Sequence, residues 1–121
     1  MGLDQYLYAI SMEDWNEQRF TNAEELGHWR KHPNLHGWFQ NLWRQRNGTT
    51  RPLRHEKVVV RLPGLAGLAS AVIKNELPYC EGEYFGTSED SDSQLSADLE
   101  IIQDAVIAAR QGKVVYYEAS A

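Results

Sequence analysis

Cysteine is nearly absent from this sequence of 121 residues, in which Cys80 is the only one. A single cysteine cannot form a disulfide within the chain, and it excludes a zinc site built from cysteines alone. This scarcity favours a reducing compartment, where thiols remain unpaired. A chain of this length can bury a hydrophobic core without such cross-links, and we expect residues 1–121 to form a single domain.

Long apolar runs are also missing. No segment approaches the roughly 20 apolar residues of a membrane span. The first residues, MGLDQY, lack the basic and apolar stretches of a signal peptide. The sequence therefore predicts a cytoplasmic protein with no membrane partner.

Acidic residues are scarce in the middle of the chain. Residues 30–61 contain eight arginines and lysines but one acidic residue, Glu56, and so carry a net charge of +7. Because the whole chain carries −5, the remaining residues carry −12. The eight basic residues are Arg30, Lys31, Arg44, Arg46, Arg51, Arg54, Lys57 and Arg61. Such a pattern can give the protein two surfaces of opposite charge, one of which attracts anions.

Strands are predicted wherever β-branched and aromatic residues gather in short runs. Four segments have this composition, residues 3–10, 57–62, 83–86 and 114–118. The helices predicted between them give the order β-α-α-α-β-α-β-α-β. This order corresponds to an α+β fold, a single small sheet with helices packed on it.

Helices are predicted from capping residues and from apolar stripes. Ser11 and the acids after it predict a short helix to about residue 20. Thr21 and Glu24 form a capping-box pattern, which predicts a second helix to about residue 31. Apolar residues at helical spacing predict three more helices, over residues 33–47, 65–75 and 95–111.

Four stretches of the chain, MGLDQYLYA, ELGHWRKHPNLHGWF, ELPYCEGEYFG and DLEIIQDA with the closing KVVYYEAS, follow one another in a recognisable order. In that order they resemble a family of small uncharacterised proteins carried by bacteriophages and prophages. The family pattern reads MGLDxYL, then GYWRKxxxIHxWF, then GFFFG, then an aromatic last strand. The resemblance covers most of the chain except residues 47–56.

The residues that match the middle motif are Trp29, Arg30, Lys31, His36, Trp38 and Phe39. His28 stands where the family has Tyr, and the chain ends in Ser120-Ala121 where similar proteins often end in Trp. The resemblance implies an accessory protein in the cytoplasm of a bacterial host, and it implies no reaction. Some such proteins carry the name phosphoglycerate kinase, but this chain lacks a phosphate-binding Gly-rich loop and is too short for a two-domain kinase.

Three histidines, His28, His32 and His36, are four residues apart, a spacing at which histidines on one helix can bind zinc. Pro33 interrupts the run, however, and no acidic residue close in sequence offers a fourth ligand. The acidic stretch 89–92 lacks the central Gly and terminal Glu of an EF-hand loop. We therefore expect no metal and no cofactor.

The segment 29–57 mixes basic residues with Trp and Phe, as nucleic-acid-binding segments do. Its aromatic residues Trp38, Phe39 and Trp43 fall on a helical stripe, which predicts that they belong to the core. The basic residues remain open to several interpretations. They can form a solvated rim, or they can bind nucleic acid, an acidic protein or a nucleotide.

Two functions from different classes follow. The favoured one is a non-enzymatic accessory protein that binds a host or phage macromolecule, for instance to inhibit a host defence or nucleic-acid machine. The expected partner is a protein, and nucleic acid bound through residues 30–61 is the alternative. The residues assigned to the binding surface are Trp29, Arg30, Lys31, His36, Arg44, Arg46, Arg51 and Arg54.

The second function is a small enzyme or nucleotide-binding protein. Its site would gather Trp29, Arg30, His36 and Tyr84, with His36 as general acid or base. A pocket that joins these side chains would favour this function, whereas burial of Trp29 and His36 away from any cavity would exclude it. The sequence leaves the identity of the partner and the oligomeric state open.

Overall fold

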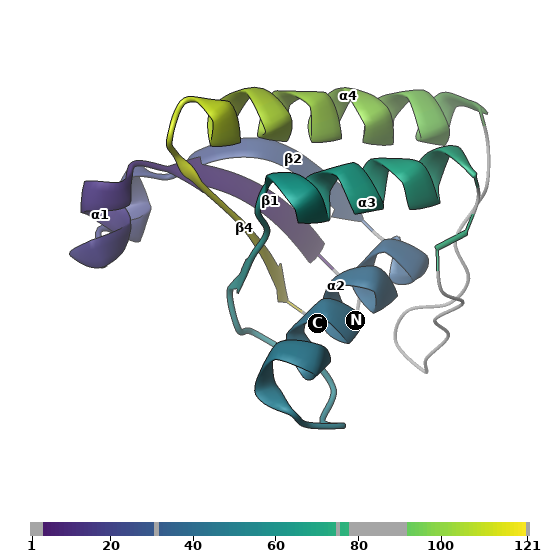
Figure 1. Cartoon of the computed structure of the whole chain (residues 1–121), viewed down its shortest axis with the longest axis horizontal. Coiled ribbons are helices and arrows are strands. Elements are labelled where there is room, and N and C mark those ends of the chain that lie inside the picture. Colours follow the sequence, from purple (N-terminus) through teal and green to yellow (C-terminus); the bar gives the residue numbers. More distant parts are fainter. Residues whose placement is uncertain (1–3, 31, 75, 78–91, 121) are drawn as a thin grey trace.

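The computed structural model describes residues 4–30, 32–74, 76–77 and 92–120, and these form an antiparallel four-stranded sheet with helices packed on it (Figure 1). The strands are β1 (Asp4–Ile10), β2 (Glu24–Arg30), β3 (Val58–Val59) and β4 (Val114–Ser120). The helices are α1 (Met12–Asn16), α2 (Pro33–Asn47), α3 (Leu62–Ile73) and α4 (Asp92–Arg110), with a 3-10 helix at Phe20–Asn22. The expected α+β class is confirmed.

The sheet is built around its two terminal strands. Its order is β2-β1-β4-β3, and β1 pairs with β4 along its whole length, from Asp4 opposite Ser120 to Ile10 opposite Val114. The last strand predicted from the sequence is β4, and it is one of the two central strands of the sheet. Leu7 and Tyr117 point to the face that α2, α3 and α4 cover, and α3 and α4 lie side by side over it (Figure 1).

The main core lies between this face and the three helices. Phe39 of α2 stacks on Tyr117 with ring centroids 4.0 Å apart, and both side chains are buried. Trp43 is buried too, and Trp38 packs against the same core. The prediction that the aromatic stripe of residues 38–43 is core is therefore confirmed.

The opposite face of the sheet carries a smaller core. Ile10, Val114 and Tyr116 are buried there under Trp15 and Phe20, which belong to α1 and to the 3-10 helix after it. The alternation of side chains along β1 and β4 explains why neighbouring residues enter different cores. Helix α1 therefore lies across the sheet from the other three helices.

The helix predicted from Thr21 to residue 31 is wrong, because residues 24–30 form β2. Thr21 lies inside the 3-10 helix, and Ala23 after it is extended, so the capping-box pattern begins no α-helix. Pairing with β1 satisfies the backbone of this segment, and Gly27 in its middle disfavours a helix. The observed order is therefore β-α-β-α-β-α-α-β apart from the 3-10 helix.

Other boundaries differ less from the expected ones. Ser11 caps α1 as predicted, since its hydroxyl accepts a hydrogen bond from the backbone N–H of Asp14 at 3.1 Å, but α1 ends at Asn16. The strand expected at 57–62 is reduced to Val58–Val59, because α3 already begins at Leu62. The strand expected at 83–86 lies outside the described residues.

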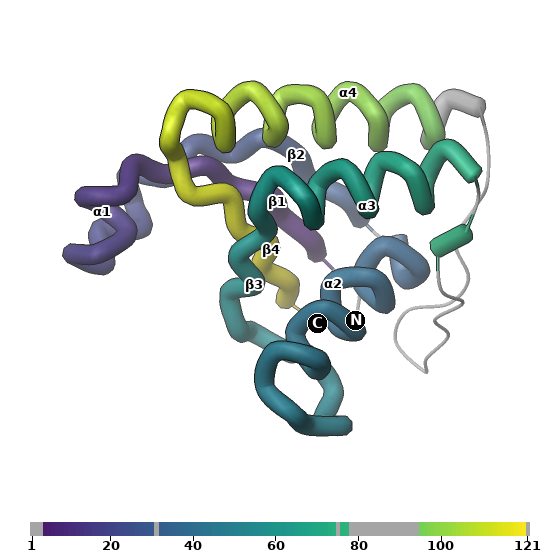
Figure 2. Tube along the Cα trace, viewed as in Figure 1, coloured from purple at the N-terminus to yellow at the C-terminus, as the bar shows by residue number. Residues whose placement is uncertain are grey.

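Both edges of the sheet have features that discourage pairing with another chain. At one edge, the Arg46 guanidinium donates a hydrogen bond to the backbone oxygen of Val59. At the other edge, the pairing of β2 with β1 shifts register between Leu7 and Tyr8, as in a β-bulge. Helix α2 also contacts β3, and Figure 2 labels both elements.

Gly27 is expected to tolerate no side chain. A Cβ at this position would lie 2.6 Å from Cγ2 of Ile101 on α4, a β-branched residue with little rotamer freedom. We expect Gly27→Ala to lower the free energy of unfolding by about 1–3 kcal/mol. Gly67 on α3 is the control, since a Cβ there meets nothing within 4 Å and Gly67→Ala should stabilise by roughly 0.5–1 kcal/mol. Urea denaturation measures both, and equal effects would contradict the packing argument.

Candidate functional site

A buried carboxylate joins α4 to β2 and to the start of α2. Asp98 is 2% exposed, and its Oδ1 accepts a hydrogen bond from the indole Nε1–H of Trp29 at 2.7 Å. Its Oδ2 lies 2.9 Å from Nε2 of His32. The burial of Trp29 thus follows from a hydrogen bond as well as from apolar packing.

His32 uses both ring nitrogens within the fold. It is the N-cap of α2, where its Nδ1 accepts the backbone N–H of Leu35 at 3.4 Å. Because Nδ1 accepts this hydrogen bond, Nε2 is the ring nitrogen that donates to Asp98. Gln5 of β1 fixes the backbone of His32, with its amide oxygen 2.6 Å from the nitrogen and its amide nitrogen 3.0 Å from the oxygen. This arrangement is a structural bridge and leaves no ring nitrogen to act as a base.

His36 is buried in the first turn of α2. It is 1% exposed, and its Nδ1 lies 2.8 Å from the hydroxyl of Tyr117. The pKa of His36 is lowered to about 4, mainly because the ring is buried; a backbone hydrogen bond at Leu53 opposes the shift, and the positive charge of Arg44 adds to it. The ring is therefore neutral at pH 7.

The second function expected from the sequence required a pocket that joins Trp29, Arg30 and His36. Trp29 and His36 are buried in the interior, and neither lines a hollow that the structure describes. Arg30 is exposed at the end of β2, with its Nε 3.8 Å from Oδ1 of Asp4. Tyr84 and Lys31 lie outside the described residues. The geometry thus does not support a catalytic role for His36.

The three histidines of the expected i, i+4, i+8 run do not share a helix. His28 is on β2, where its ring stacks on Tyr6 at 4.7 Å, whereas His32 caps α2 and His36 is inside it. Within the described ranges, no three His, Cys, Asp or Glu side chains are grouped to hold a metal ion.

Most of the basic residues gather at the end of α2 and in the loop after it. The Nε of Arg44 donates to the backbone oxygen of Arg51 at 2.8 Å. The guanidinium of Arg51 lies 5.2 Å from the centre of the Trp43 ring. Arg54 follows on the same loop and is exposed. Arg30 belongs to β2, the strand at the opposite edge of the sheet, so it is separate from this group.

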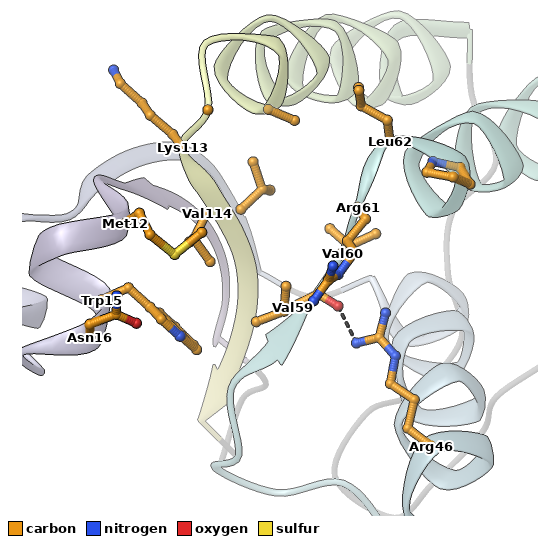
Figure 3. A pocket seen from close by; sticks show the side chains of 14 residues that line it. Met12, Trp15, Asn16, Arg46, Val59, Val60, Arg61, Leu62, Lys113 and Val114 are labelled. Atoms are coloured by element: carbon orange, nitrogen blue, oxygen red, sulfur yellow. Dashed lines mark hydrogen bonds between the residues drawn. The ribbon is translucent and has the colours of Figure 1, made fainter.

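A hollow of about 670 Å³ opens beside β3, on the same side as Arg46 (Figure 3). Met12 and Trp15 of α1 form one wall, and residues 59–63 of β3 and the start of α3 form the other. Residues 113–115 at the start of β4 lie between the two walls. Segments from both ends of the chain therefore meet at this site.

The hollow combines apolar walls with positive charge. Its basic side chains are Arg46, Arg61 and Lys113, and none of the lining residues described is acidic. Two of its apolar side chains are unusually exposed, Met12 at 54% and Leu62 at 41%. A surface of this kind can bind an anion that also carries an apolar group.

Local contacts fix part of the lining of the hollow. Arg46 is fixed by the backbone oxygen of Val59, and Lys113 directly follows Gly112, whose φ of 83° turns the chain from α4 into β4. Trp15 packs against Tyr116 with ring centroids 5.3 Å apart. After α1, the Nε of Arg19 lies 2.7 Å from Oδ1 of Asp14. This hydrogen bond lowers the pKa of the Asp14 carboxyl.

Sequence reasoning assigned Arg46 to the binding surface but missed the other residues of the hollow. Arg61 was counted only in the net charge of the basic segment, and Met12, Trp15 and Lys113 were not singled out. The sequence contains one signal for them, since Met12 and Trp15 are three residues apart on a short helix that is otherwise polar.

Comparison with protein-family models, with curated proteins and with solved structures finds no match for this chain. In the part of the chain that is described, no helix is long and apolar enough to span a membrane.

Proposed function

We propose that this chain is a non-enzymatic accessory protein of bacteriophage type that acts by binding an anionic host or phage macromolecule. The observation that carries the proposal is the hollow beside β3, in which three basic side chains and no described acidic one surround apolar walls. Inhibition of a host machine is one form that such binding can take. The resemblance to small phage proteins agrees with this role and assigns no reaction.

The buried polar side chains make hydrogen bonds within the fold, and this favours a binding function over a catalytic one. Trp29 and His32 each bond to Asp98 inside the fold, and His36 bonds to Tyr117. A general acid or base must reach its substrate, and these side chains are closed off from solvent. Exposed side chains, among them the basic residues of the hollow, are available for contact with a partner.

Reversing charge at the hollow is expected to abolish capture of the partner. We choose Arg61→Glu with Lys113→Glu, because both residues line the hollow and both are exposed. The immobilised protein is incubated with bacterial lysate, and bound proteins and nucleic acids are identified. A macromolecule retained by the parent should be lost from this variant.

The matched control carries the same change in charge elsewhere. Lys74→Glu with Arg110→Glu replaces two exposed basic residues that do not line the hollow. This variant should retain the macromolecule as the parent does. Equal capture by the two variants would contradict the proposed role of the hollow.

A further inference from the structure

The chemistry of the hollow also indicates which class of macromolecule enters it. Resting on the proposed function, we infer that the occupant is an acidic peptide segment of a partner protein, with a bulky apolar side chain among its carboxylates. The inference assigns the apolar side chain to the space between α1 and β3, and the carboxylates to the basic side chains at its rim.

The walls of the hollow indicate that the peptide carries a bulky apolar side chain. Met12 and Leu62 expose much of their side chains at the mouth, and valines of β3 and β4 lie between them. Exposed apolar surface gathered around a hollow is typical of a site that another molecule covers. A volume of about 670 Å³ can hold a large side chain together with part of its backbone.

The basic residues of the hollow indicate that the peptide carries carboxylates. Arg46, Arg61 and Lys113 come from three separate segments of the chain and line the hollow, and no acidic residue is among the described lining residues (Figure 3). Each of these side chains carries a positive charge that attracts anions. Carboxylates on a peptide would compensate these charges, and Arg46 is already oriented by its bond to Val59.

The walls fit a protein partner better than a nucleic acid. Single-stranded nucleic acids bind by stacking bases on open aromatic faces. Trp15 is the only aromatic residue described in the lining. The centre of its ring already lies 5.6 Å from that of Phe20 and 5.3 Å from that of Tyr116. Methionine, tryptophan and arginine are instead the residues enriched in protein interfaces.

The net charge of the chain points in the same direction. A long polyanion would extend beyond the basic rim over a protein that carries −5 overall. The long-range field would then oppose its binding. A short acidic segment is attracted by the rim and contacts little of the remaining surface.

Selection from a displayed library of random dodecapeptides tests the inference, with a fluorescent single-stranded oligonucleotide of random sequence as the second probe. The parent protein should select peptides that combine several acidic residues with Leu, Phe or another bulky apolar residue. Affinity for these peptides should fall roughly tenfold or more in Arg61→Glu with Lys113→Glu, and remain unchanged in the Lys74→Glu, Arg110→Glu control. Met12→Ser provides a second variant that keeps every charge, and it should weaken the same peptides.

Four results would overturn the inference. If the selected peptides are neutral or basic, the occupant is not an acidic peptide. If replacing the apolar residue of a selected peptide by Ser leaves its affinity unchanged, the hollow does not bind that side chain. If the oligonucleotide binds through the rim while no peptide is selected, the occupant is a nucleic acid and the proposed binding function still stands. If neither probe depends on the rim, both proposals fail.

Discussion

Replacing Asp98 by alanine is expected to lower the free energy of unfolding by about 2–5 kcal/mol, a large part of the stability of a small domain. Asp98 accepts hydrogen bonds from Trp29 at 2.7 Å and from His32 at 2.9 Å, and all three side chains are buried. Without the carboxylate, two buried donors lose an acceptor while water cannot reach them. The bridge between α4, β2 and the start of α2 is then lost.

A control on the same helix separates this effect from a general loss of helix stability. Asp104 is exposed on α4, and Asp104→Ala should change the free energy of unfolding by less than about 0.5 kcal/mol. Asp98→Asn should fall between the two, since its amide keeps one oxygen acceptor but places an N–H₂ group toward a donor. Urea denaturation measures all three variants. A loss of less than about 1 kcal/mol in Asp98→Ala would show that the bridge contributes little.

The sequence predicts the long helices, but it does not predict which residues Asp98 bonds to in this bridge. The long helices carry a local signal, because their apolar residues recur at helical spacing and their ends carry Pro33, Gly48 or Gly112. Asp98 also has a local signal that went unused. It lies three residues after Leu95 and four before Ile102, so it is a carboxylate within an apolar stripe. Its partners cannot be read in the same way, because Trp29 and His32 are more than 60 residues away.

The strand β2 shows why local patterns fail elsewhere. Thr21 and Glu24 have the spacing of a capping box, but a cap stabilises a helix by only about 1 kcal/mol. Pairing with β1 along six registered positions and burial of Trp29 stabilise the strand instead. Tertiary contacts therefore decided the conformation of this segment, as they often do for short segments.

The hollow beside β3 was beyond prediction for a geometric reason. Met12, Arg61 and Lys113 are about 50 residues apart along the chain and meet only because β4 lies between α1 and β3. The excess of basic residues in the middle segment predicts a surface that attracts anions, and this stays a prediction. Its position depends on which of those residues lie beside an apolar opening, and that follows from the strand order alone.

His36 is expected to make the stability of the protein depend strongly on pH between about pH 4 and pH 6.5. Its pKa is about 4 in the folded protein because the ring is buried, compared with about 6.5 in an unfolded chain. In this interval the unfolded chain binds a proton that the folded protein excludes. Stability therefore rises with pH across the interval, by about 3 kcal/mol in total. Acidification from neutral pH should lower the free energy of unfolding by that amount.

Substitution of His36 by glutamine removes the titrating group and tests this assignment. His36→Gln should be less stable than the parent at pH 7, because its contact with Tyr117 changes, but its stability should fall much less as the pH is lowered to about 4. His55→Gln is the control, since His55 is exposed on the loop before β3 and its removal should leave the pH dependence intact. Carboxyl groups such as Asp14 and Glu56, whose pKa values are lowered in the fold, titrate equally in all three proteins. Urea denaturation across this pH interval therefore isolates the histidine. Parallel curves for the parent and His36→Gln would mean that His36 does not stay neutral inside the fold, and that another group senses the proton.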